Sequence, residues 1–234
     1  MQPDDFVAQV AGVAVLAEPA RRDLYLFVVA QPAAVSRDQA ASGVGLPRHT
    51  AKFHLDKLVE EGLLDVEFKR LSGRVGPGAG RPTKLYRRSG RQLSVALPER
   101  TYDVAGELMA QAIDESARDG SSVIEALHRV AAGRGSVLGQ QARSRAGAAP
   151  NSERLLGAVV ETMADSGYEP RADEGRVTLA NCPFHRLASE HTDLVCGMNL
   201  ALIGSMVAEL GDNGLSARLE PAPDRCCVVL SRQR

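Results

Sequence analysis

The order of secondary-structure signals between residues 21 and 88 limits most strongly how this chain can fold. The stretch RRDLYLFVVA (21–30) predicts a helix, because apolar residues recur on one of its sides. Ser36 has the character of an N-cap that opens a short second helix, and GVGL (43–46) predicts a turn. A third helix is expected over 47–61, with Gly62 as its stop.

A basic hairpin is predicted directly after these helices. LLDVEFKRL alternates as a strand, SGRVGPGAGRP is a glycine-rich tip, and TKLYRR is the returning strand. Between Phe68 and Arg91 the chain has basic side chains and no acidic ones: Lys69, Arg70, Arg74, Arg81, Lys84, Arg87, Arg88 and Arg91. Helix, short helix, turn, helix and basic hairpin together predict a winged helix-turn-helix.

In this fold the helix over 47–61 would enter the major groove of double-stranded DNA and the hairpin would approach phosphates or a minor groove. The candidate DNA-binding residues are Arg48, His49, Thr50 and Lys52 of the helix and Arg74, Arg81 and Lys84 of the hairpin. His54 is left out, because it points toward the first helix at the edge of the buried face. The competing interpretation is that the basic hairpin is merely a solvated edge.

The rest of the chain differs in charge and in pattern. Residues 1–100 hold 15 Lys and Arg against 11 Asp and Glu, whereas residues 101–234 hold 13 against 18. Helices are predicted over 102–118, 121–142, 152–167 and 197–210, and strands over 176–180, 215–219 and 226–230. We therefore expect an α+β protein with a winged helix-turn-helix domain (1–100), a helical dimerisation segment (101–150) and a small α/β cysteine-containing domain (151–234).

No apolar run is long enough to span a bilayer, and MQPDDFVAQV lacks the features of a signal peptide. We therefore expect a cytoplasmic protein with no membrane partner, whose thiols are kept reduced.

All four cysteines fall in the last 53 residues, with the spacing C-x13-C-x29-CC. Only Cys182 and His185 have the close spacing typical of zinc ligands. Single cysteines separated by whole elements favour an iron–sulfur cluster, whose size lets it collect thiolates from several elements. The predicted ligands are Cys182, Cys196 and Cys226, with Cys227 and His185 as weaker candidates.

Local structure supports this ranking of the thiols. Cys196 is expected at the start of the helix over 197–210, where the helix dipole would stabilise a thiolate. Neighbouring side chains of a strand point to opposite faces, so Cys226 is expected to share the face of Val228 and Leu230 while Cys227 points away. The competing interpretation is that the cysteines are small hydrophobic core residues, which suits Cys227 best.

A wing containing GAGRPTKLY, then a helical segment, then NCPF, LVCGMNL and RCCVVL resembles the SufR-type regulators. These are iron–sulfur-dependent repressors of cluster-assembly genes within the ArsR-like helix-turn-helix group. The resemblance extends from about residue 20 to residue 230. It implies a homodimer whose cluster-loaded form binds palindromic operators, with cluster ligands at Cys182, Cys196 and one of Cys226 and Cys227. A [4Fe–4S] cluster is expected, with [2Fe–2S] or zinc as alternatives.

The paired cysteines, the CPFH segment and the 13-residue first spacing depart from the family pattern. They leave the fourth ligand, the regulated genes and the signal (iron–sulfur status, redox state, oxygen or nitric oxide) open. Two other functions also stay open: a winged-helix regulator that senses zinc or a small organic ligand, and a cysteine-dependent enzyme. The enzyme would need a thiol beside a base, and only Cys196 with His191 or Cys182 with His185 fit that requirement.

Overall fold

The computed structural model describes residues 3–70, 82–148, 150–173, 175–211 and 215–232. The chain divides into two compact units, residues 2–95 and 96–234. No helix among the described residues has the length and apolar character that crossing a membrane requires.

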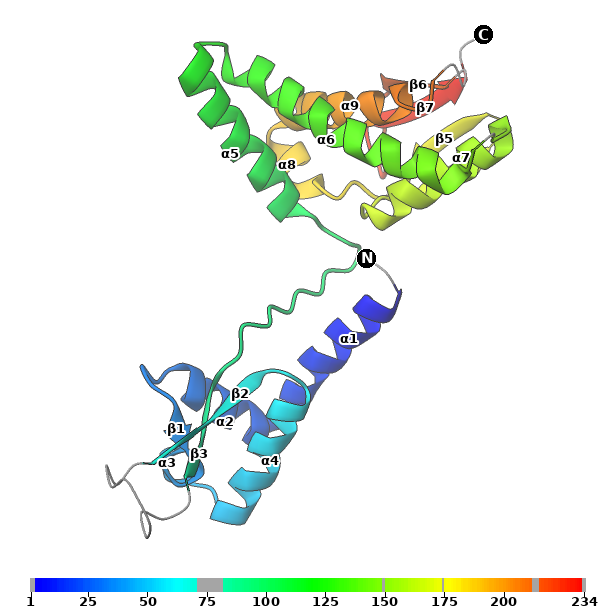
Figure 1. Cartoon of the computed structure of the whole chain (residues 1–234). Coiled ribbons are helices and arrows are strands. Elements are labelled where there is room, and N and C mark those ends of the chain that lie inside the picture. Colours follow the sequence, from blue (N-terminus) through cyan, green and yellow to red (C-terminus); the bar gives the residue numbers. More distant parts are fainter. Residues whose placement is uncertain (1–2, 71–81, 149, 174, 212–214, 233–234) are drawn as a thin grey trace. The chain divides into compact units, whose positions relative to one another are not determined.

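The N-terminal unit combines helices with a small antiparallel sheet (Figure 1). Its helices are α1 (Pro3–Ala14), the 3-10 turn η1 (Val15–Ala17), α2 (Pro19–Val29), α3 (Arg37–Gly43) and α4 (Arg48–Glu60). Its strands, in the spatial order β1-β3-β2, are β1 (Val35–Ser36), β3 (Thr83–Arg88) and β2 (Leu64–Lys69). Three helices followed by a hairpin match the predicted plan, while α1 and β1 were not expected.

Local sequence signals account for the tight connections between these helices. Ser36 is the N-cap of α3 and forms a reciprocal capping box with Gln39. Gly43, at the end of α3, lies so close to the Phe27 ring that a Cβ there would overlap the ring. Gly62 has a φ of 71° and follows the end of α4, so the expected glycine stop is confirmed.

The core of this unit holds α2, α4 and the sheet together. It contains Leu24, Leu55, Leu58 and Tyr86, each at most 2% exposed. His54 is buried beside this core and accepts a 3.5 Å hydrogen bond at Nδ1 from Arg21 Nε of α2. The structural role expected for His54 is therefore confirmed.

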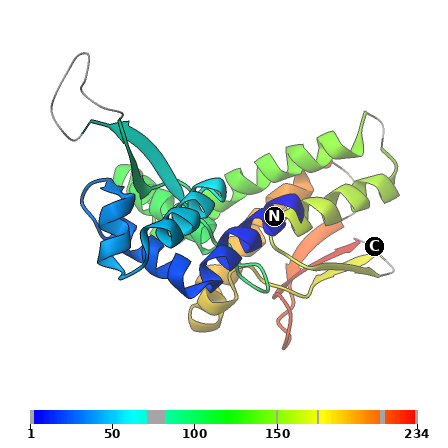
Figure 2. The ribbon, with the colours of Figure 1, turned by 90° about the horizontal axis from the view of Figure 1, so that it is seen from below.

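The C-terminal unit packs a helical layer on a four-stranded antiparallel sheet (Figures 1 and 2). Its helices are α5 (Tyr102–Asp119), α6 (Val123–Ala146), α7 (Ser152–Asp165), α8 (His185–Glu190) and α9 (Thr192–Ala208). Its strands, in spatial order, are β4 (Pro170–Asp173), β5 (Arg176–Leu179), β7 (Val228–Arg232) and β6 (Leu215–Leu219). One hydrophobic core runs through all of it, so the helices of 101–150 share a core with the segment 151–234.

The contact between α6 and α9 depends on two glycines of α6. A Cβ at Gly135 would overlap the carbonyl oxygen of Leu202, and one at Gly139 would overlap that of Met206. The backbones of the two helices therefore touch without an intervening side chain. This close contact places α6 directly against the helix that carries Cys196.

Candidate functional site

The outward face of α4 carries most of the residues predicted to bind DNA. Arg48, His49 and Lys52 are exposed and Thr50 is half-buried, while the opposite face packs into the core. Their placement agrees with the face expected from the sequence, and their role in DNA contact stays a prediction.

The cations of this face already have acidic partners within the unit. Arg48 Nε forms an ion pair with Asp38 of α3, and Lys52 Nζ lies 3.2 Å from Asp56 Oδ2. The side chains of Arg48 and Lys52 are 65% and 60% exposed, so each pair is worth about 0–1 kcal/mol. Because these pairs are weak, phosphate groups can replace the carboxylates without a large penalty.

Lys84 of the hairpin is turned toward α4. Its Nζ lies 2.5 Å from Asp56 Oδ1 and 5.0 Å from the centre of the Tyr86 ring. Tyr86 Oη donates a 3.0 Å hydrogen bond to the same carboxylate oxygen. Asp56 therefore joins the predicted recognition helix to strand β3.

The contact between Asp56 and Tyr86 changes the pKa of both side chains. Burial alone would raise the pKa of Asp56, but hydrogen bonds from Lys84, Lys52 and Tyr86 outweigh it and the net shift is downward. The pKa of Tyr86 is raised by burial and by the nearby Asp56 carboxylate. Asp56 is therefore held as a carboxylate with two lysines around it.

Phe53 is an exposed residue of this face that the sequence analysis did not select. It lies on α4 beside Lys52, its side chain is 65% exposed, and it is not part of the hydrophobic core of the unit. Its ring makes an edge-to-face contact with His54, at 5.2 Å between centroids. Its exposure could have been predicted, because Phe53 lies outside the apolar face of the helix that Ala51, Leu55 and Leu58 form.

The tip of the basic hairpin lies outside the described residues, and with it the predicted phosphate contacts Arg74 and Arg81. The described parts of the hairpin pair in register from Leu64 with Arg88 to Lys69 with Thr83.

The four cysteines come from three segments of the C-terminal unit. Cys182 lies in the loop after β5, Cys196 lies in α9, and Cys226 and Cys227 immediately precede β7. The Cys226 N–H donates a 2.8 Å hydrogen bond to the Leu179 carbonyl, which brings the segment of Cys226 beside that of Cys182.

Two details of the predicted surroundings were wrong. The helix begins at Thr192 and not at residue 197, so Cys196 lies in its second turn and not at its first residue. Strand β7 begins at Val228 and not at residue 226, so the alternation of strand side chains does not apply to the two adjacent cysteines.

The four thiols lie in two neighbouring pairs. The Cys182 and Cys226 thiols lie close enough to shift each other's pKa, and so do the Cys196 and Cys227 thiols. Cys182, Cys196 and Cys226 are buried, Cys227 is half-buried, and all four are free of disulfides. Within the described ranges, no three His, Cys, Asp or Glu side chains converge as ligands of a single metal ion.

The thiols of these pairs differ in pKa. The hydrogen bond from Cys226 lowers the pKa of Cys182, helped by the Phe184 N–H and the Arg100 charge against the effect of burial. The pKa of Cys226 is raised by the same hydrogen bond and by burial. Burial and Cys227 raise the pKa of Cys196 to about 12. Cys182 is therefore the first of these three to become a thiolate.

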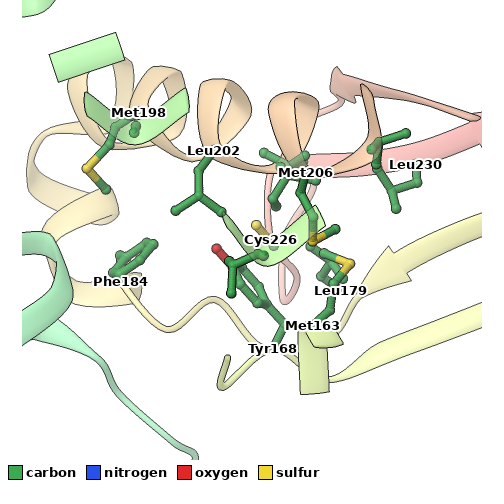
Figure 3. Packing of buried hydrophobic residues seen from close by; sticks show 14 of the residues in the cluster. Met163, Tyr168, Leu179, Phe184, Met198, Leu202, Met206, Cys226 and Leu230 are labelled. Carbon is green, nitrogen blue, oxygen red and sulfur yellow. The ribbon is translucent and has the colours of Figure 1, made fainter. Parts of the chain in front are cut away.

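A buried polar chain supports Cys226. Asn199 of α9, only 2% exposed, donates from Nδ2 to Cys226 Sγ at 3.3 Å and accepts a hydrogen bond at Oδ1 from Tyr168 Oη. Figure 3 shows Tyr168 and Cys226 close together beneath α9. Neither Asn199 nor Tyr168 was predicted from the sequence, since a single Asn or Tyr on an apolar helix or loop carries no motif.

The loop of Cys182 is fixed by Asn181 and Arg100. Asn181 Nδ2 donates to the carbonyls of Glu99 at 3.0 Å and Gly167 at 2.7 Å. Arg100 Nη1 donates to the Asn181 side chain and to the Cys182 carbonyl at 3.3 Å.

His185 and His191 do not join the buried thiols. Both are exposed, and His185 donates only its backbone N–H to the Cys182 carbonyl, at 3.0 Å. In the described part of the chain, neither histidine side chain hydrogen-bonds to Cys182 or Cys196.

A helix-turn-helix domain family model matches residues 16–67, which include α2, α3, α4 and the start of β2. The chain carries a helix-turn-helix domain. Such a domain indicates a DNA-binding transcription regulator, and regulators of this kind are typically not enzymes. No curated protein and no solved structure matched the chain.

Proposed function

We propose that the protein is a homodimeric transcription repressor whose binding to a palindromic DNA operator is controlled by an iron–sulfur cluster in the C-terminal unit. The cluster ligands are Cys182, Cys196 and Cys226, with Cys227 as the fourth. The observation that carries this proposal is the gathering of four free cysteines from three segments into two adjacent thiol pairs.

The surroundings of the thiols suit thiolate ligands. Asn199 Nδ2 donates to Cys226 Sγ, and the backbone N–H groups of Phe184 and Val228 lower the pKa of Cys182 and Cys226, which stabilises negative charge on sulfur. The site is also largely buried, which limits access of water and oxidants to the sulfurs.

The origin of the cysteines in three separate segments favours a cluster over a single zinc ion. Four thiolates around zinc must each lie about 2.3 Å from one point, and no three candidate ligands among the described residues are arranged in that way. A cluster is larger than a single ion, so it can collect thiolates from separate elements of the chain. When bound, an iron–sulfur cluster supplies chemistry that responds to oxidants and to reducing conditions.

The chain offers a route from Cys196 to the dimer contact that we propose for α5 and α6. Cys196 lies on α9, whose backbone touches α6 at Gly135 and Gly139. The helices α5 and α6 in turn expose apolar side chains, among them Ile113, Ile124 and Val137. Exposed apolar side chains of this kind suit contact with a second copy of the chain. A shift of α9 would therefore reach the contact that sets the spacing of two recognition helices on DNA.

The test is anaerobic purification of the full chain with visible absorption spectroscopy and iron and sulfide assays. We expect a coloured protein, and we expect Cys182→Ser, Cys196→Ser and Cys226→Ser to lose the colour. His185→Ala is the matched control and is expected to keep it, because that side chain is exposed. A colourless protein loaded with zinc would overturn the cluster, while DNA selection with the same preparation tests the regulator independently.

A further inference from the structure

A cavity of about 230 Å³ lies in the C-terminal unit beside the cysteine site, and no cysteine lines it. Its apolar wall contains Val104 of α5, Leu138 of α6, Leu202 of α9 and Phe184. Tyr168 completes the wall on the side of the thiols, and Figure 3 shows Phe184, Leu202 and Tyr168 around the same region. The helices α5, α6, α7 and α9 all contribute to it.

Most polar groups of this cavity are already engaged with one another. Arg145 Nη2 lies 2.5 Å from Asp165 Oδ2, and Ser166 Oγ donates to the Thr162 carbonyl at 2.8 Å. Tyr168 Oη is bonded to Asn199.

Two polar side chains that line the cavity, those of Arg134 and Gln141, are not engaged in this way among the described residues. Arg134 and Gln141 lie seven residues apart on α6, and so on the same side of that helix, with Leu138 between them. Neither of them has a hydrogen bond or ion pair with the residues that the structure describes. The cavity therefore combines an apolar wall with one cation and one amide that are available to a ligand.

The volume limits what can enter. A cavity of about 150 Å³ is enough for benzene in another protein, and drug-sized ligands need about 300 Å³ or more. A ligand with one aromatic ring and a short charged substituent has a volume between these limits. Arginine binds carboxylates through two parallel N–H groups, so the arm that matches Arg134 is a carboxylate.

We propose that this cavity binds a small aromatic carboxylate of the size of benzoate or phenylacetate, with the ring against Leu138, Leu202 and Phe184 and the carboxylate on Arg134. The site shares two residues with the supports of the cysteines. Tyr168 holds Asn199, which donates to Cys226, and the Phe184 N–H points at Cys182. The ligand is thus a second input to the same unit, and its binding does not depend on a cluster.

The test measures binding of benzoate and phenylacetate to the purified full chain by ligand-observed NMR and calorimetry. We expect a Kd of about 1 mM or below for at least one of them. Acetate, which lacks the ring, and benzyl alcohol, which lacks the charge, are expected to bind at least about tenfold more weakly.

Variants locate the site. Arg134→Gln should weaken binding about tenfold or more, and Val104→Phe should abolish it by filling the cavity. Arg118→Gln removes an exposed arginine of α5 that does not line the cavity, and should leave binding unchanged. Circular dichroism confirms that each variant is folded. The proposal is overturned if neither carboxylate binds, if Arg134→Gln and Arg118→Gln bind equally well, or if benzyl alcohol binds as tightly as benzoate.

Discussion

Lys84 Nζ lies 2.5 Å from Asp56 Oδ1, and this contact joins strand β3 of the wing to the helix expected to enter the major groove. Two elements that are both expected to contact DNA are thereby fixed to each other within the protein. The same carboxylate accepts from Tyr86 and pairs with Lys52, so one acidic side chain organises three neighbours.

Asp56→Asn is expected to lower the free energy of unfolding by about 1 kcal/mol at pH 7, because it weakens these contacts. The pKa of Asp56 is lowered in the folded protein, so its stabilising effect is complete above the ordinary value of 3.8 and is lost as the pH falls below it. Urea unfolding at pH 7 and pH 3 measures this difference.

Asp65→Asn is the matched control, since its pair with Arg87 is exposed and the two atoms lie 3.5 Å apart. It should change stability far less than Asp56→Asn at pH 7. An effect of Asp56→Asn that stayed the same at both pH values would contradict the role assigned to its carboxylate.

Phe53→Ala is expected to weaken binding to a selected DNA duplex by about tenfold, since an exposed aromatic ring on this helix can contact a thymine methyl group. Its stability should change by less than about 0.5 kcal/mol, because the ring is outside the core. Gel shift and thermal unfolding separate these effects. Leu55→Ala, on the buried face of the same helix, should instead destabilise by about 2–5 kcal/mol. DNA affinity unaffected by Phe53→Ala would exclude the ring from the interface.

Gly139→Ala is expected to destabilise the C-terminal unit by about 1–3 kcal/mol, because the new methyl group overlaps the Met206 carbonyl and α6 and α9 must separate. Gly133→Ala lies on the same helix with open space around it, and should be neutral or stabilising by up to about 1 kcal/mol. Chemical unfolding of the two variants side by side makes the comparison. Equal effects would mean that helix propensity, and not the close approach of the backbones, governs both positions.

Asn199→Leu is expected to destabilise by about 1–3 kcal/mol, because it leaves the buried Tyr168 hydroxyl without its acceptor. Tyr168→Phe in the same background should recover part of that loss, since no hydroxyl is then left unpaired. A double-mutant cycle of unfolding free energies gives the coupling between the two side chains. Strict additivity would show that the hydrogen bond contributes nothing.

The helix-turn-helix plan was predictable because its signals are local. The capping box of Ser36 and Gln39, the stop at Gly62 and the apolar stripe of α4 all act within a few residues of one another. The two-residue strand β1 was not predictable, since it exists only through its pairing with β3, about 50 residues later in the chain.

The surroundings of the cysteines were harder to predict, because they depend on distant partners. The helix predicted from residue 197 begins at Thr192, so Gly197 lies inside α9, where a Cβ would come within 2.9 Å of His128 Nε2. Asp224 has a φ of 59°, and the turn around it delays β7 until after the two adjacent cysteines. Lys84 looked free for DNA contact because its acidic partner, Asp56, is 28 residues away in the chain.

Side chains between two packed helices normally act as a cushion, because a change of rotamer can absorb a small displacement of either backbone. At Gly135 and Gly139 no side chain separates the helices, and the main chain of α6 contacts the main chain of α9 directly. A displacement of α9 at Cys196 is therefore transmitted to α6 without being absorbed by side chains between the two helices. In this unit the smallest residues are the ones that make the connection stiff.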